Sequence, residues 1–91
     1  MNKEVEILVS GMVQGVFFRV TTQQKARELD VTGWVRNEPD GSVKILAQGE
    51  ENSLQKLIDW CKTGSPFTKI DNVNIKRKKK RETFKNFEIE K

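Results

Sequence analysis

The sequence predicts an α+β fold in which two helices lie on one face of an antiparallel sheet. Short stretches in which apolar and polar residues alternate are typical of strands with one buried face. Two longer stretches carry apolar residues at intervals of three and four, which indicates amphipathic helices that need a sheet to cover. The expected order is β-α-β-β-α-β followed by a short terminal β, a split β-α-β sandwich. A right-handed crossover would place the first strand between the third and the fourth.

The N-terminal half is expected to hold a strand, a helix and a hairpin. Apolar residues at 5, 7 and 9 predict the first strand. A helical pattern begins at Phe18 and is expected to end near Asp30, a residue type that tolerates the left-handed angles of a helix end. Residues 33–37 and 43–47 predict two strands that flank a Pro-Asp-Gly turn, so they should form a hairpin.

A second amphipathic helix is predicted by four apolar residues at helical spacing: Leu54, Leu57, Ile58 and Cys61. Asn52 or Ser53 is expected to cap its start, and Gly64 followed by Pro66 to end it. Trp60 stands at the edge of the apolar stripe and should be partly buried. Cys61 stands on the stripe itself, so it is expected to be an inert core thiol rather than a nucleophile.

The last two strands are predicted by alternation at Val73 and Ile75, and by a short apolar pair at 87 and 89. Six consecutive basic residues, 76–81, follow the fourth strand, and the net charge is +4. Without those six, 11 basic and 13 acidic residues remain, so the basic character belongs to one run. We expect that run to be a solvated strand end and loop, which would also protect an edge strand from pairing with other chains.

The composition excludes several kinds of chemistry. The 91 residues contain no histidine and one cysteine, so His-based nucleophile systems, phosphohistidine and His-ligated metals are ruled out, as is an intramolecular disulfide. A chain of this length predicts one domain over residues 1–91. No apolar run approaches the roughly 20 residues of a membrane span, and no export signal follows Met1, so a cytoplasmic location is expected.

The stretch from Gly11 to Arg19 is the strongest functional candidate, because it joins the first strand to the first helix. A helix start presents unpaired N–H groups and the positive end of the helix dipole. The glycines permit left-handed angles, so that successive N–H groups can converge on an anion. Arg19 adds a planar cationic fork that suits phosphate oxygens. The alternative is an ordinary strand-to-helix turn with a surface arginine.

Residues 9–19 read Val-Ser-Gly-Met-Val-Gln-Gly-Val-Phe-Phe-Arg, and residues 32–37 read Thr-Gly-Trp-Val-Arg-Asn, followed by Asp-Gly-Ser-Val at 40–43. Both blocks resemble the signature of the acylphosphatase family and keep the separation that the family shows. The resemblance covers essentially the whole chain, including the ferredoxin-like order of elements. It implies hydrolysis of the carboxyl–phosphate anhydride of an acyl phosphate, without a metal or other cofactor.

The resemblance also implies roles for individual residues. Arg19 would hold the phosphate, and Asn37 would position the attacking water. The backbone cradle around the phosphate would be formed by five residues: Gln14, Gly15, Val16, Phe17 and Phe18. Simpler alternatives remain open at this point: Gln14 could brace the loop, and Asn37 could shape the hairpin turn. Trp34 is expected to be a core residue rather than a surface that contacts a ligand.

Two other functions compete with hydrolysis. This fold class also recognises RNA, and residues 76–81 are basic, but the strand aromatics on which bases would stack are few. A regulatory domain that binds an acyl phosphate without turnover is the other alternative. We expect a small acyl phosphate as the ligand, inorganic phosphate as a product, a monomer, and neither nucleic acid nor membrane as a partner.

Overall fold

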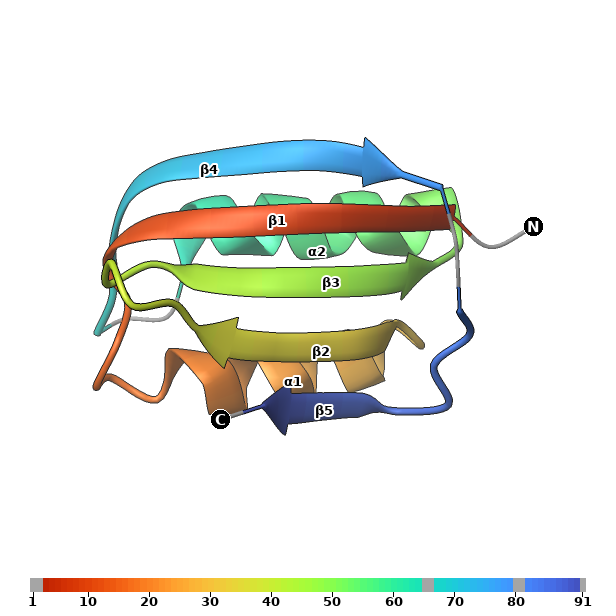
Figure 1. The fold of residues 1–91 in the computed structure, drawn as a ribbon, viewed down its shortest axis with the longest axis horizontal. Coiled ribbons are helices and arrows are strands. Elements are labelled where there is room, and N and C mark those ends of the chain that lie inside the picture. Colours follow the sequence, from red (N-terminus) through yellow and green to blue (C-terminus); the bar gives the residue numbers. More distant parts are fainter. Residues whose placement is uncertain (1–2, 65–66, 80–81, 91) are drawn as a thin grey trace.

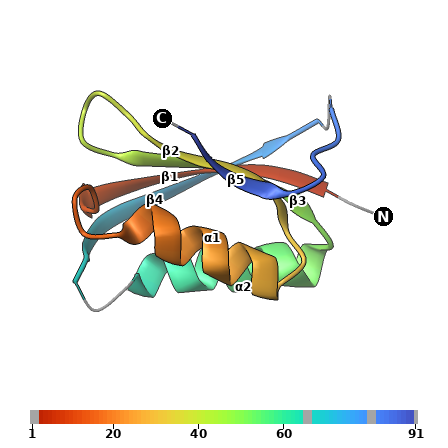
Figure 2. The same cartoon turned by 90° about the horizontal axis from the view of Figure 1, so that it is seen from below.

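The structure of the chain, a computed structural model, describes residues 3–64, 67–79 and 82–90. Its elements are, in order, β1 (Lys3–Met12), α1 (Phe18–Glu28), β2 (Thr32–Asn37), β3 (Val43–Gly49), α2 (Glu51–Thr63), β4 (Lys69–Lys78) and β5 (Phe87–Glu90). The strands form one sheet in the order β4-β1-β3-β2-β5 (Figure 1). Both helices lie on the same face of it (Figure 2). The predicted α+β class, order of elements and one-sided packing are confirmed.

The strand pairing defines the direction of each strand in the sheet. β1 is antiparallel to both β3 and β4, which confirms its predicted place between them. β2 is antiparallel to β3, but β5 is parallel to β2, so the complete sheet is mixed rather than antiparallel. The chain leaves β4 at the end of the sheet where β2 begins. It then returns beside β2, and β5 must therefore run in the same direction as β2.

The hydrophobic core lies between the sheet and the two helices. Alternate residues of β1 point into it, since Val5, Ile7 and Val9 are fully buried. The predicted stripe of α2 is confirmed, because all four of its apolar residues are buried. Burial raises the pKa of the Cys61 thiol to about 12, which keeps it protonated and inert at neutral pH. None of the helices in the described parts of the chain has the length and apolar character needed to cross a membrane.

The first helix is anchored to the second at its N-terminal residue. The rings of Phe18 and Trp60 stack with centroids 5.3 Å apart and an interplanar angle of 9°. Phe18 is fully buried, and Trp60 is half-buried against the core, as predicted. Aromatic pairs of this geometry contribute about 0.5–1.5 kcal/mol beyond the area that they bury. The stack therefore fixes the position of the helix end that follows the candidate loop.

The helix ends agree with the prediction in one case and differ in the other. Asp30 has φ of 58°, so it provides the left-handed residue expected just beyond α1. The predicted cap of α2 is wrong: the helix begins at Glu51 with Glu50 as its N-cap, and Asn52 and Ser53 lie inside its first turn. The negative charge of Glu51 near the helix start compensates for the missing side-chain cap. Gly64 follows the helix as predicted, whereas Pro66 lies outside the described residues.

The basic run lies at the end of an edge strand. β4 is longer than predicted and occupies the edge of the sheet, with residues 76–78 exposed at its end. Arg77 forms an ion pair with Glu51 at 2.7 Å, and Lys78 forms one with Glu6 at 3.0 Å. The described part of the run is thus the solvated strand end that the sequence predicts, and residues 80–81 lie outside the described residues.

Gly33 should be required by the close approach of β2 to β3. It has φ of +137°, and a Cβ at this position would lie 1.8 Å from the carbonyl oxygen of Leu46. We expect Gly33→Ala to lower the free energy of unfolding by more than about 2 kcal/mol, as measured by urea denaturation. Gly41→Ala is the matched control, because Gly41 also has a positive φ of +96° but no atom within 4 Å of the added Cβ. Equal losses in the two variants would contradict this steric explanation.

Candidate active site

The loop between β1 and α1 is shaped by two residues with left-handed angles. Gly15 has φ of 76°, and Phe17, the N-cap of α1, has φ of 60°. No side chain in the part of the chain that the structure describes caps the start of α1, and no acidic residue lies in its first turn. The N–H groups at this helix end therefore remain available to an external acceptor, and the helix dipole favours a negatively charged one.

Phe17 shows that the loop conformation has a cost. Left-handed angles are uncommon for a large aromatic residue and cost on the order of 1–3 kcal/mol. The Phe17 side chain is also 79% exposed, so burial of the ring recovers little of that cost. A strained residue of this kind at a helix start is typical of a functional loop whose backbone directions matter more than its stability.

Arg19 belongs to the first turn of α1 and is half-buried. Within the described residues, its guanidinium has no recorded hydrogen bond or ion pair. It lines a cavity of about 310 Å³ together with Val13, Gly15, Phe17, Phe18, Val20 and Ile89. The structure therefore brings Arg19 together with three of the five predicted cradle residues. Among the described residues, the Arg19 guanidinium has no partner and can bind a ligand.

Asn37 is the last residue of β2. Its side-chain oxygen, Oδ1, is buried and has no hydrogen-bond partner among the described residues. A buried polar atom without a partner costs about 1–3 kcal/mol, so native proteins rarely keep one without a use. Asn37 does not line the 310 Å³ cavity, but it lies immediately before the turn that the cradle loop contacts.

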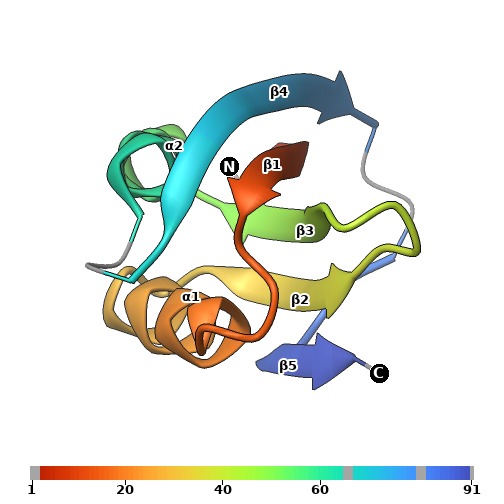
Figure 3. The ribbon, with the colours of Figure 1, turned by 90° about the vertical axis from the view of Figure 1, so that its left-hand side faces the viewer.

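Gln14 makes that contact. Its side-chain Nε2 donates hydrogen bonds to the carbonyl oxygens of Glu38, at 2.8 Å, and Ser42, at 2.9 Å. The loop and the β2–β3 turn lie at the same end of the sheet in Figure 1, and Figure 3 looks onto that end. The amide of Gln14 therefore braces the loop against the turn beside Asn37, which favours the bracing alternative for this side chain. That its backbone N–H belongs to the cradle stays a prediction, since Gln14 is not among the residues that line the cavity.

The turn that receives Gln14 has polar contacts of its own, and sequence patterns did not indicate them. The Glu38 carboxylate pairs with Arg36 at 3.1 Å and with Lys44 at 3.2 Å. Asp40 accepts hydrogen bonds from the hydroxyl and the backbone N–H of Ser42, and these bonds lower the pKa of the Asp40 carboxyl. The acceptors of Gln14 are backbone carbonyls, which are present at every residue, so only the structure could identify them.

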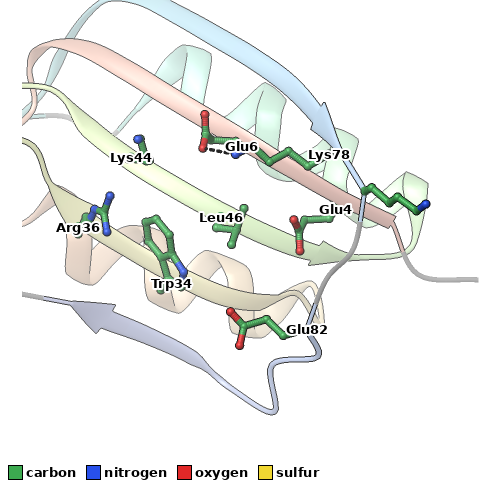
Figure 4. A pocket seen from close by; sticks show the side chains of 9 residues that line it. Glu4, Glu6, Trp34, Arg36, Lys44, Leu46, Lys78 and Glu82 are labelled. Atoms are coloured by element: carbon green, nitrogen blue, oxygen red, sulfur yellow. Dashed lines mark ion pairs between the residues drawn. The ribbon is translucent and has the colours of Figure 1, made fainter.

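A larger hollow of about 460 Å³ lies on the opposite, helix-free face of the sheet (Figure 4). Trp34 lies here rather than in the core, so the prediction for Trp34 was wrong: its neighbour Val35 takes the inward position of β2. The Arg36 guanidinium lies 4.6 Å from the Trp34 ring centroid. Lys78 pairs with Glu6 and, chiefly through that hydrogen bond, lowers the pKa of the Glu6 carboxyl. The acidic and basic side chains that line this hollow largely neutralise one another, so they do not form a site of one charge for a ligand.

The residues that the structure describes contain no group of three or more Cys, Asp or Glu side chains placed to hold a metal ion. Together with the absence of histidine from the sequence, this leaves no evident donor set near the loop. The available chemistry is that of backbone N–H groups, one guanidinium and one amide. Such groups can bind an anion and stabilise charge that develops on its oxygen atoms.

The fold and the site define a class: a ferredoxin-like α+β domain in which a loop with left-handed residues and an arginine in the first helical turn lie at the start of its first helix. A sequence model of the acylphosphatase family matches residues 5–89. The chain therefore belongs to the acylphosphatase family, and it is an enzyme of that class.

Individual relatives agree with this assignment. An acylphosphatase of Marinobacter nauticus is 55% identical over 67 residues, which cover 74% of this chain and 73% of the relative. An acylphosphatase of Shewanella amazonensis is 47% identical over 87 residues and 96% of each chain. The crystal structure of acylphosphatase from Bacillus subtilis superposes with a TM-score of 0.94 at 40% identity, and the match covers 100% of both chains.

Gln14→Ala should separate bracing from anion binding. We expect it to lower the free energy of unfolding by about 1–2 kcal/mol, because two hydrogen bonds are lost. We also expect kcat for an acyl phosphate to fall roughly ten- to hundredfold, because the loop is no longer aligned with Asn37. Urea denaturation and steady-state kinetics measure the two effects. Gln55→Ala, which removes an exposed contact to Asp59, is the control and should change neither substantially. An unchanged kcat in Gln14→Ala would contradict the bracing role.

Proposed function

We propose that Arg19 and the loop N–H groups bind the phosphate of an acyl phosphate, and that Asn37 orients the water that attacks it. The observation that carries this proposal is the uncommitted guanidinium of Arg19, which shares one cavity with the uncapped start of α1. A phosphate in this cavity would meet the guanidinium and the loop N–H groups together, and each of these favours a dianion. Residues 1–91 would act as one domain.

The proposed reaction needs little from the protein beyond position and charge. The water oxygen forms a bond to phosphorus while the bond from phosphorus to the acyl oxygen breaks, and a carboxylate departs with that electron pair. Carboxylic acids have a pKa of about 4, so the leaving group needs no general acid. The proton released by water passes to a phosphate oxygen of the substrate. The products are a carboxylate and inorganic phosphate, and Arg19 with the loop stabilises the charge on the equatorial oxygens.

Asn37 would hold the water through its amide. An amide cannot accept a proton near neutral pH, so its role in this proposal is geometric. Its buried Oδ1, which has no partner among the residues that the structure describes, can accept a hydrogen bond from water, and that bond would remove the cost of leaving it unpaired. Gln14 supports this arrangement, since it ties the cradle to the turn that follows Asn37.

The proposal also includes the oligomeric state, the location and the partners of the enzyme. We propose a metal-independent monomer that works in the cytoplasm on a small-molecule substrate. Nucleic acid is not a proposed partner, because Arg36 already lies over the ring of Trp34, which lies on the helix-free face. Two cations at the end of β4 are also paired, Arg77 with Glu51 and Lys78 with Glu6.

Arg19→Ala tests the phosphate site. A ligand at 100 times its dissociation constant adds about 2.7 kcal/mol to the free energy of unfolding, and inorganic phosphate should do this for the unmodified chain. We expect Arg19→Ala to lose this stabilisation together with hydrolysis of benzoyl phosphate in excess chelator. Arg19→Lys should also be poor, because a point charge cannot replace the planar fork.

Lys25→Ala is the matched control, since it removes one positive charge from the same helix, away from the cavity. It should retain both turnover and the stabilisation by phosphate. An Arg19→Ala variant with normal turnover would refute the assignment of the site.

Asn37→Ala tests the water-positioning role. We expect kcat to fall roughly a hundred- to a thousandfold, as for loss of one preorganised transition-state contact. The inhibition constant of inorganic phosphate should remain nearly unchanged, because Arg19 and the loop are intact. Asn37→Asp should be no better, since its charge repels the anionic substrate. A variant that loses thermal stability but keeps its kcat would instead assign Asn37 to shaping the turn. Asn74→Ala, on the exposed part of β4, is the control for loss of an asparagine.

A further inference from the structure

The cavity beside Arg19 has an apolar wall that phosphate binding does not explain. Among the described residues that line it, Arg19 is the one that carries a charge. The wall consists of five apolar side chains: Val13, Phe17, Phe18, Val20 and Ile89. The volume of about 310 Å³ lies at the lower end of the range for small-molecule sites, roughly 300–1,000 Å³. The cavity is therefore suited to a ligand with one anionic end and one apolar end.

Two residues of this wall are exposed although they are large and apolar. Phe17 is 79% exposed and Val20 is 43% exposed. They come from the loop and from the first turn of α1, while Ile89 reaches the same cavity from β5. Exposed apolar side chains that gather beside a polar binding group are typical of ligand sites.

We propose that this wall, Phe17, Val20 and Ile89 above all, binds the acyl group and makes the enzyme select acyl phosphates with an uncharged, apolar acyl group. The proposal rests on the proposed function and adds the substrate class to it. The phosphate of the substrate already occupies Arg19. A second negative charge on the acyl group would meet no other cation among the lining residues, and placing it unpaired against apolar side chains is costly.

Other charges near the wall do not change this conclusion. Glu90, the neighbour of Ile89, lies 3.9 Å from the Arg36 guanidinium and belongs to the group of ion pairs around the hairpin turn. Lys25, a positive charge further along α1, does not line the cavity. A carboxylate on the acyl group would therefore gain little attraction to offset the loss of its hydration.

The test compares two rigid substrates, 4-methylbenzoyl phosphate and 4-carboxybenzoyl phosphate, which differ in one para substituent. We expect kcat/KM to be at least about tenfold higher for the methyl compound. Val20→Lys should lower this ratio by about tenfold or reverse it, because the new ammonium can pair with the carboxylate. The ratio is taken within each variant, so any effect of the new charge on the phosphate end cancels.

Ile75→Lys is the matched control, since Ile75 is 41% exposed and lies on β4 at the opposite edge of the sheet from β5. It should leave the ratio unchanged. Val20→Ala provides a second variant without a charge, and it should lower kcat/KM for 4-methylbenzoyl phosphate more than for acetyl phosphate.

Equal kcat/KM values for the two substrates, or a ratio that Val20→Lys does not move, would overturn the proposed acyl site while leaving the hydrolytic function in place. Absence of turnover with both substrates, in a chain that remains folded, would overturn the proposed function and the acyl site with it.

Discussion

The amide of Gln14 provides the constraint on which the site depends. It joins the loop after β1 to the turn after β2 through two carbonyl acceptors, Glu38 and Ser42. Arg19 lies on a helix and Asn37 lies at a strand end, and without this link no contact of Gln14 would join the two elements. The Glu38 carboxylate pairs with Arg36 and Lys44, so the turn that receives the brace has polar contacts of its own. Two hydrogen bonds thus align groups that are 18 positions apart in the sequence.

Packing in the core sets the direction of α1, and therefore the direction of its dipole. Phe18 is fully buried at the first position of α1 and stacks on Trp60 of α2, so this helix end cannot turn away from the loop. The preceding residue, Phe17, points its ring outward and takes the left-handed angles that the turn requires. The two adjacent phenylalanines therefore have different roles. Phe18 packs the helix against the core, and the exposed Phe17 lines the cavity.

Much of the fold could be predicted because its signals are periodic. Alternation and helical spacing identified the strands and the helices, and the handedness of the crossover placed β1. The predictions that were wrong depended on tertiary detail. Asn52 and Ser53 match a cap by residue type, but the N-cap of α2 lies two or three residues earlier, at Glu50. Trp34 reads as a core residue by size, yet strand alternation gives the inward place to Val35. The partners of Gln14 are backbone carbonyls, which no side-chain pattern reveals.

The site keeps several groups in states that cost stability. Phe17 has strained angles. Within residues 3–64, 67–79 and 82–90, the buried Oδ1 of Asn37 has no hydrogen-bond partner and the half-buried Arg19 has no ion pair. The core and the sheet hold these groups in place before any substrate arrives. Preorganisation of this kind is the main source of electrostatic catalysis, because no reorganisation is needed when charge develops. In a chain without histidine, fixed groups of this kind would supply the charge stabilisation that the proposed reaction needs.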